Sequence, residues 1–444
     1  MKYRMNILLM SGPRNQATHV ALAPIEVGIE LGASRAPGKR KLKPMPDDTN
    51  PLVRIVSLKL QDIGCFEHID LYFASQFNLL CGANGVGKST ILAVIGRAFS
   101  QHQSELRRRA AAQRPGHWHA LISVGESPVE AQGEAGGFMP TEQDEPQQLA
   151  YQSSKSLLYF KANRDFVYSR LEAISRDPIG EIIHSSASAV TGVDQTDLKR
   201  WIANRYLFSR HPGSLTEWQI ANFDFAKRCF SILDPRIEFS SVEATTFDTY
   251  VQTPQGRVPF EYLSSGFRAS LAMLLGIIRE IEIRGFGINA HSFSGIILVD
   301  EIDLHLHPTW QRLIVTALKE AFPFAQFIAT THSPHMIQNA ELGEVIALID
   351  DGSAATRLGD FNIGKYGFKG WSLEEILRDV MGLKDTTSEA FSNAMLQFDS
   401  AIEREDSESV RFWLYELESM IHPANHLRKL LRLQAAPIEG LYND

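Results

Sequence analysis

Hydrophobic and polar positions alternate over the first part of the chain that carries a periodic pattern. Between Val53 and Phe73, apolar residues recur at a spacing that predicts two paired β-strands. The run FNLLCG, Phe77 to Gly82, is mostly apolar and predicts a short buried strand leading into a glycine-rich loop. A helix is expected after this loop, from Ala93 to Phe99.

Two further apolar runs lie far downstream of that loop. SGIILVDEID, Ser294 to Asp303, ends in carboxylates, and AQFIATTHSPH, residues 325–335, contains His332. Continuous apolar runs are typical of parallel strands that are covered on both faces, and functional groups gather at the carboxyl ends of such strands. The pattern therefore predicts an α/β fold with a mixed or parallel sheet.

The remaining patterns divide the chain into three parts. Residues 1–50 are rich in Gly, Pro and charge and predict a disordered or loosely ordered tail. Residues 51–350 are predicted to form the main domain, with a helical arm or insertion at about 100–235. Residues 351–444 are predicted to form a helical region for association with a partner or with a second copy.

Local patterns add detail to the second and third parts. DLKRWIANRYLF, residues 197–208, predicts a helix of the arm, whereas residues 125–148 predict a solvated loop because they are acidic and rich in Gly and Pro. Ser372 and Glu375 stand at capping-box spacing. Two helices are expected after them, from the apolar stripes Phe391, Met395, Phe398 and Ile402, and Val410, Leu414, Leu417 and Ile421.

Composition limits the classes of partner and compartment. The 44 basic and 52 acidic side chains give a formal charge of -8, so nucleic-acid contact would need a local basic patch. Three scattered cysteines indicate a reducing compartment rather than a disulfide framework. No apolar run reaches the length of a membrane span. A cytoplasmic protein without a membrane partner is therefore expected.

The strongest chemical signal is GANGVGKST, residues 82–90, which matches the phosphate-binding loop motif between a predicted strand and a predicted helix. Glycines let backbone N–H groups converge on phosphate oxygens, and the helix N-terminus favours an anion. Lys88 would reach the β- and γ-phosphates of ATP, and Ser89 would hold Mg²⁺. The predicted nucleotide-binding residues of this loop are Gly82, Asn84, Gly85, Gly87, Lys88, Ser89 and Thr90.

The acidic strand end supplies the other half of the predicted chemistry. Asp300 would join Ser89 in holding Mg²⁺, and Glu301 would orient or deprotonate the attacking water. His332, at the end of the next predicted strand, could reach the γ-phosphate. The alternatives are that the two carboxylates only cap the strand and that His332 is an ordinary core or surface residue.

The order of these motifs separates families of P-loop ATPases. The acidic strand follows the P-loop at a long distance, and LSSG, Leu263 to Gly266, lies directly upstream of it. This arrangement resembles the ABC-type ATPases, including the SMC and RecF branch. The resemblance implies that Ser264, Ser265 and Gly266 open a helix and cap the ATP bound by a second subunit. Relatives often carry Glu or Gln where this chain has Phe267, and an ordinary helix N-cap is the alternative.

A narrower resemblance rests on Asp300 to Ile337 and on GWSLEEILRDVMGL, residues 370–383. Both look like the ATPase subunits of Septu anti-phage systems (PtuA), including versions attached to retrons. The resemblance covers about residues 51–444. It implies a homodimer or higher oligomer, an HNH-type nuclease subunit, a retron reverse transcriptase with its DNA–RNA product, and a place for Asp303 in the loop between subunits.

Three other patterns favour weaker interpretations. His305, His307, His332 and His335 could suggest a metal site, although hydrogen bonding explains HLH more simply. EVIALIDDG, residues 344–352, is faintly similar to the acidic strand ends of Toprim nucleases, but no further set of carboxylates follows it. LRRRAAAQR, residues 106–114, could touch a phosphate backbone or form a solvated arginine face.

Three functions remain open from the sequence. The first is an ATP-hydrolysing regulator of a nuclease in anti-phage defence. The second is a RecF-like DNA-repair ATPase that binds duplex DNA directly, which would need a basic groove across a dimer. The third is a scaffold that binds ATP and scarcely hydrolyses it.

Overall fold

The computed structural model describes residues 50–102, 106–139, 142, 150–162, 170–175, 177–178, 180–350, 356–361, 363–383 and 387–440. All of them belong to the compact unit Pro46–Asp444. The predicted tail, residues 1–50, therefore lies outside the described residues except for Asn50. The boundaries predicted at 51, 350 and 351 stay predictions.

A six-stranded sheet carries the apolar runs of the sequence. Its strand order is β13-β12-β3-β11-β10-β6, and all neighbours are parallel except the antiparallel pair β12 and β13. The strands are β3 (Phe77–Gly82), β6 (Leu157–Phe160), β10 (Ile296–Val299), β11 (Gln326–Thr330), β12 (Val345–Asp350) and β13 (Thr356–Leu358). The predicted strands at 77–82, 294–303 and 325–335 are thus confirmed.

Both faces of this sheet are covered, which explains the continuous apolar runs. On β10, Ile297 and Val299 belong to one core, whereas Ile296 and Leu298 belong to the other. Layers of helix and sheet therefore pack on each side, and the carboxyl edge of the sheet remains for function.

A four-stranded antiparallel sheet, ordered β2-β1-β4-β5, forms a second layer. Its strands are β1 (Val53–Ile63), β2 (Phe66–Tyr72), β4 (Gly116–Val124) and β5 (Ser127–Ala135), and the predicted pair within 53–73 is confirmed. The prediction of a solvated loop at 125–148 is wrong for the residues that form β5. That strand pairs with β4 along its whole length. Its buried side chains, Ala131 and Ala135, are small, so the alternation of apolar and polar residues is too weak to predict a strand.

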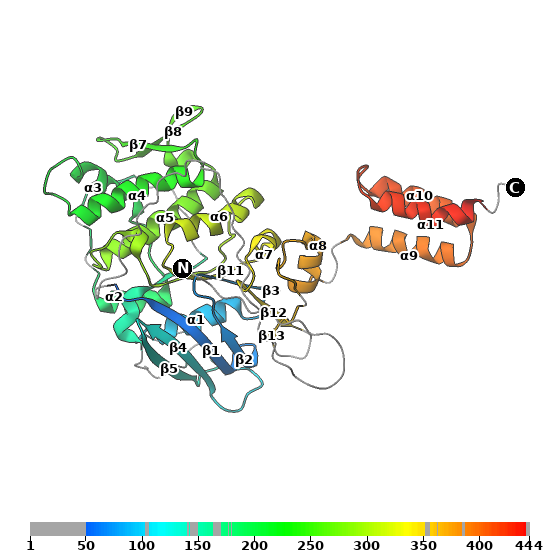
Figure 1. Ribbon diagram of the computed structural model, residues 1–444, viewed down its shortest axis with the longest axis horizontal. Helices are drawn as coiled ribbons and strands as arrows, with labels where there is room; N and C mark the ends of the chain where they lie inside the picture. Colours follow the sequence, from blue (N-terminus) through cyan, green and yellow to red (C-terminus); the bar gives the residue numbers. More distant parts are fainter. Residues whose placement is uncertain are drawn as a thin grey trace, which may run out of the picture. The chain divides into compact units, whose positions relative to one another are not determined.

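Helix α1 (Lys88–Ala98) lies between the two sheets, because its apolar residues share one core with β1, β4, β10 and β11 (Figure 1). The helix begins five residues before the predicted start at Ala93. Gly87 precedes it in the left-handed region, with φ of 90°, so the glycine loop ends directly at the first helical turn. The loop and the helix N-terminus are therefore one structural unit.

Helices cover the other face of the six-stranded sheet. They are α3 (Leu198–Phe208), α4 (Glu217–Leu233), α5 (Ser265–Ile283) and α6 (Pro308–Ala321), and their buried residues share one core with β3, β6, β10 and β11. Figure 1 shows α3, α4 and α5 beneath a three-stranded sheet. That sheet consists of β7 (Glu238–Val242), β8 (Thr249–Thr253) and β9 (Gly256–Pro259).

The expected arm at about 100–235 is only partly helical. Its first half supplies β4, β5 and β6 to the two larger sheets. Its second half contains α2 (Ile182–Thr191), α3 and α4, and the predicted helix at 197–208 is confirmed as α3. Short 3-10 turns join elements at Tyr151–Ser156, Phe260–Tyr262 and Ala290–Ser292.

The chain beyond residue 350 begins against the six-stranded sheet. Ser372 and Glu375 form the predicted capping box of α8 (Leu373–Glu375), which continues as a π-helical turn, Ile376–Val380. Apolar residues of this turn pack with α7 (Pro334–Asn339) and β12. The first segment of the predicted C-terminal region is therefore anchored on the main sheet.

Three helices end the described chain. The predicted helices are confirmed as α9 (Glu389–Glu403) and α10 (Ser407–Met420), and α11 (Leu427–Gly440) is an additional one. Phe398, Leu417 and Leu431, one from each helix, are completely buried in a shared core. None of the helices described combines the length and the apolar composition needed to cross a lipid bilayer.

Gln326 at the start of β11 joins the two larger sheets. Its amide donates to the carbonyl oxygens of Ile55 and Ala74, both at 2.9 Å, and its oxygen accepts from Ile55 N at 2.8 Å. The side chain is 1% exposed. Replacing it would leave the buried N–H and carbonyl oxygen of Ile55 without this partner, whereas the Ala74 carbonyl would keep its bond from Asn78 Nδ2 at 3.0 Å.

We therefore predict that Gln326→Ala lowers the free energy of unfolding by about 3 kcal/mol, measured by urea denaturation of the full chain. The control is Gln132→Ala on the exposed face of β5, which should change stability by less than about 0.5 kcal/mol. Equal midpoints for Gln326→Ala and the wild type would contradict the prediction.

Candidate nucleotide site

The glycines of the loop after β3 serve different purposes. Gly82, Gly85 and Gly87 all have positive φ, at 136°, 81° and 90°. A Cβ atom at Gly82 would lie 2.1 Å from the Leu348 carbonyl oxygen, and one at Gly87 would lie 2.5 Å from the Phe66 ring. Gly85 meets no such obstacle and is required for its backbone conformation alone.

Lys88 lies within this loop. Its Nζ donates to the carbonyl oxygens of Gly82 at 3.0 Å and Ala83 at 2.8 Å, and the residue is 6% exposed. Burial lowers the pKa of Lys88, and the neighbouring thiol and carboxylates partly oppose that shift. The loop thus concentrates one positive charge close to the N-terminus of α1, where a polyphosphate can be bound. Asn84 and Thr90 complete the loop and the first helical turn, and Asn84 is exposed.

Ser89, Asp300 and Thr330 meet at the carboxyl edge of the sheet. Ser89 Oγ donates to Asp300 Oδ1 at 3.1 Å, and Thr330 Oγ1 donates to the same oxygen at 2.6 Å. Thr330 ends β11, the strand between β3 and β10. A hydroxyl and a carboxylate oxygen at this distance are the hard oxygen ligands that suit Mg²⁺. The predicted pair Ser89 and Asp300 is therefore brought together.

Glu301 follows Asp300 in a constrained conformation. Its φ is 49°, unusual for a residue with a side chain, and its N–H donates to Thr330 Oγ1 at 2.6 Å. One threonine hydroxyl thus accepts from the backbone of Glu301 and donates to Asp300. This bridge fixes the turn on which Asp300, the predicted metal ligand, and Glu301, the predicted catalytic residue, lie.

Asp303 holds the segment that carries His332. Its Oδ1 accepts from Thr331 Oγ1 at 2.7 Å and from His332 N at 3.1 Å. Burial lowers the pKa of His332, and the charge of Lys88 acts in the same direction. The imidazole is therefore neutral at pH 7, so that one ring nitrogen can donate a hydrogen bond and the other can accept one. Through Asp303 and Thr330, the segment that carries His332 lies beside the acidic turn.

The segment Ser264 to Gly266 opens α5 as predicted. Ser264 is the N-cap, and its side chain accepts from Phe267 N at 3.4 Å, so the ordinary capping role is confirmed. Ser264 and Ser265 are exposed, whereas Gly266 is buried. A Cβ atom at Gly266 would lie 3.1 Å from the His305 carbonyl oxygen. The glycine therefore lets the start of α5 approach the loop after the acidic strand.

Phe267 stands where the resemblance leads us to expect Glu or Gln, and here it is a buried packing residue. Its ring is 2% exposed and packs edge-on against Trp310 of α6, with ring centroids 5.5 Å apart. This contact anchors the first turn of α5 through packing. Contact of Ser264, Ser265 or Gly266 with a nucleotide in a second subunit stays a prediction.

Thr330, Thr331 and Gln311 are site residues that sequence reasoning missed. Gln311 of α6 accepts from Ser333 Oγ at 2.7 Å and so links α6 to the His332 segment. The signal was the pair of threonines directly after the apolar run of β11, where polar groups meet the edge of the sheet. Among the described residues, no group of three His, Cys, Asp or Glu side chains is placed to hold a metal ion.

Two family profiles match the chain. One, described as "AAA domain, putative AbiEii toxin, Type IV TA system", matches residues 160–337, and one described as "AAA domain" matches residues 57–128. Together they cover the loop upstream of α1 and the acidic strand with its neighbours. Fold, motif order and profiles define this protein as an ABC-type ATPase.

The chain also aligns over most of its length with a curated relative. Septu protein PtuA from Bacillus thuringiensis is 39% identical over 390 residues, which cover 86% of this chain and 98% of that protein. The chain belongs to the PtuA family of Septu proteins. This family confirms the resemblance drawn from the motifs, and with it the coarse prediction of a defence-associated ATPase.

Shorter or more distant similarities also exist. Retron Ec83 probable ATPase from Escherichia coli is 44% identical over 75 residues, which cover 17% of this chain and 14% of that protein. A solved SMC head domain from Thermotoga maritima is 16% identical with a TM-score of 0.43, covering 70% of this chain and all of that domain.

The Thr330 bridge yields a test of the site. Thr330→Val removes both hydrogen bonds while keeping the shape of the side chain, so Asp300 and the Glu301 turn lose their alignment. We predict a 10- to 100-fold lower rate of ATP hydrolysis, the range typical of groups that orient metal ligands. Turnover is measured by phosphate release. Thr330→Ser is the control and should keep most of the rate, and equal rates for both variants would contradict the role of the hydroxyl.

Proposed function

We propose that the chain is the ATP-binding and ATP-hydrolysing subunit of a bacterial anti-phage defence complex, in which ATP-dependent closure of two copies controls an associated nuclease. The main support is the meeting of Ser89, Asp300 and Thr330 at one edge of the sheet. The membership in the PtuA family supports the defence role.

ATP would bind with its phosphates on the loop after β3. Backbone N–H groups of Gly85 and Gly87, together with Lys88, favour the negative charge of the β- and γ-phosphates. Mg²⁺, held by Ser89 and Asp300, would supply a charge that neutralises the phosphate oxygens during transfer. Glu301 would orient or deprotonate the attacking water, and the neutral His332 would contact the γ-phosphate.

A second copy would complete each site. Ser264 and Ser265 are exposed at the N-terminus of the 19-residue helix α5, so their hydroxyls and the helix dipole can face an anion on a partner surface. Closure would exclude water and add fixed dipoles around the γ-phosphate, which is how phosphoryl transfer is mostly accelerated. Hydrolysis would then weaken the contact between copies.

The remaining partners are proposed by analogy. The family resemblance implies an HNH-type nuclease subunit, and similarity to a retron ATPase extends this to a reverse transcriptase with its DNA–RNA product. The C-terminal helices offer an association surface, because the apolar side chains of Phe412, Tyr415 and Leu433 are 55%, 72% and 70% exposed.

The first test separates a hydrolysing enzyme from an ATP-binding scaffold. Glu301→Gln keeps the size of the side chain but removes the base. We predict at least about 100-fold slower ATP hydrolysis and a stable ATP-bound dimer, measured by phosphate release and by light scattering after size exclusion. Identical slow turnover in the wild type and the variant would instead favour the scaffold.

The second test asks whether sites are shared between copies. Lys88→Ala disables the phosphate loop, and Ser264→Arg blocks the exposed start of α5. Each variant alone should be inactive, whereas a mixture should recover part of the turnover because a mixed dimer contains one intact composite site. The control is Lys88→Ala mixed with a Lys88→Ala, Ser264→Arg double variant. Full activity of Ser264→Arg alone would overturn the shared site.

A further inference from the structure

A short piece of the C-terminal region lies against the nucleotide loop. Residues 376–382, called here the C-terminal anchor, consist of the π-helical turn Ile376–Val380 and the two residues after it. A Cβ atom at Gly382 would lie 3.7 Å from the Cβ atom of Ala83, which is ordinary van der Waals contact. The anchor therefore touches the loop after β3, although the two are far apart in the sequence.

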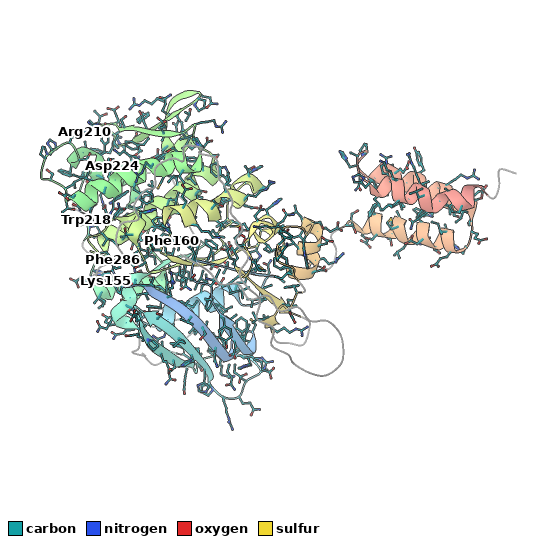
Figure 2. The ribbon with its side chains drawn as sticks, viewed as in Figure 1. Lys155, Phe160, Arg210, Trp218, Asp224 and Phe286 are labelled. Carbon is teal, nitrogen blue, oxygen red and sulfur yellow. The ribbon has the colours of Figure 1, made fainter. Side chains whose placement is uncertain are left out.

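The anchor also packs against the strand end that carries this loop. Cys81, the residue before Gly82, is completely buried in one apolar core with Ile376 and Val380 of the anchor, which are 0% and 1% exposed. Figure 2 shows side chains filling the region where α7 and α8 meet the sheet, which is where this core lies. Since close-packed interiors transmit small displacements to their neighbours, the base of the loop and the anchor are in a position to affect each other.

The same core reaches the segment that carries His332. Helix α7 begins two residues later, at Pro334, and its residue Ile337 is completely buried in this core. Gln338 of α7 also donates through Nε2 to the carbonyl oxygen of Trp371, at 2.8 Å, shortly before the anchor. Two elements of the proposed ATP site, the loop after β3 and the His332 segment, therefore pack against the same part of the C-terminal region.

The backbone of the anchor differs from that of an ordinary helix. Met381 N donates to Ile376 O at 3.0 Å, which is the hydrogen bond of a π-helix, and Gly382 follows with a φ of 71°. Turns of π-helix are rare and are frequently found at functional sites. Five residues of sequence separate Leu383 from Glu389, where α9 begins. A short length of chain thus joins the anchor to the three-helix unit α9–α11.

Nucleotide binding would act on the loop at the point of this contact. Lys88 Nζ donates to the carbonyl oxygens of Gly82 and Ala83, at 3.0 and 2.8 Å. A bound phosphate would offer further oxygen acceptors to the same ammonium group and to the backbone N–H groups of the loop. Ala83 therefore belongs both to the contact with the anchor and to the hydrogen bonds that hold Lys88.

We propose that the C-terminal anchor regulates the ATP site: ATP on the loop after β3 stabilises the packed anchor, and the packed anchor raises the affinity for ATP. This inference rests on the proposed ATP site but does not need closure between two copies. Thermodynamic linkage makes the two effects equal in size. A partner that binds α9–α11 and loosens the anchor would therefore weaken ATP binding by the same factor.

The first test is hydrogen–deuterium exchange of the full chain, measured by mass spectrometry with and without Mg²⁺ and AMP-PNP, a non-hydrolysable ATP analogue. We expect AMP-PNP to slow exchange in peptides from residues 371–383 by about fivefold or more, the lower end of typical couplings between sites. Peptides from residues 82–90 report separately on the ATP site. Protection of 82–90 without any change at 371–383 would overturn the regulatory inference alone, whereas no protection of 82–90 would overturn the ATP site and this inference with it.

A matched pair of variants tests the reciprocal effect. Val380→Ala loosens the anchor and should raise the Kd for AMP-PNP about fivefold, measured by isothermal titration calorimetry, and reduce the protection of residues 371–383. Val410→Ala is the control, because Val410 is also completely buried but belongs to the core of α9–α11. It should keep both the affinity and the protection. An unchanged affinity in Val380→Ala, or equal weakening by both variants, would contradict the role of the anchor.

Discussion

The functional centre depends on one constraint, the order of parallel strands in the six-stranded sheet. Strand β11 pairs with β3 on one side and with β10 on the other. Its last residue, Thr330, therefore stands between the helix that follows the P-loop and the acidic turn that follows β10. Because the carboxyl ends of parallel strands meet at one edge, residues more than two hundred positions apart share a single carboxylate oxygen, Asp300 Oδ1.

The same edge organises the loop between the site and the start of α5. Asp303 is hydrogen-bonded to Thr331 and to the His332 backbone, and the loop after it passes within van der Waals distance of Gly266. The acidic turn is therefore linked to the His332 segment through the Asp303 side chain, and to the first turn of α5 through the backbone of the loop at His305. The two parts of the nucleotide site that we propose to be shared between copies are thus connected within each copy.

Motif chemistry could be predicted from the sequence because it depends on local order. Spacing along the chain is enough to identify the glycines of the loop, Lys88 and the carboxylates that follow an apolar run. Thr330 could not be assigned, since its importance comes from β11 lying between β3 and β10, although it follows both in the chain. Strand β5 was missed because its buried side chains are small, and α11 because its apolar stripe lacks a clear start and contains Pro437.

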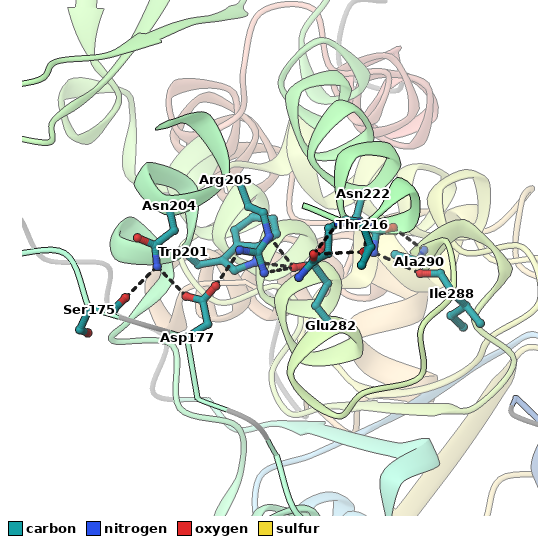
Figure 3. Close-up of polar contacts among 11 residues, drawn as sticks. Ser175, Asp177, Trp201, Asn204, Arg205, Thr216, Asn222, Glu282, Ile288 and Ala290 are labelled. Atoms are coloured by element: carbon teal, nitrogen blue, oxygen red, sulfur yellow. Dashed lines mark hydrogen bonds and ion pairs between the residues drawn. The ribbon is translucent and has the colours of Figure 1, made fainter. Parts of the chain in front are cut away.

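Helix α3 contacts both ends of α5, directly or through the segment before it. Lys199 of α3, 2% exposed, pairs with Asp248 and Glu261, and Glu261 lies three residues before Ser264. Two turns further along α3, Arg205 pairs with Glu282 near the end of α5 (Figure 3). Breaking a buried ion pair leaves an uncompensated charge, so these pairs hold α3 against α5 and against the segment before it. The exposed serines at the start of α5 therefore lie on a helix that is packed and ion-paired against α3, which is what the cap that we propose on a neighbour's nucleotide requires.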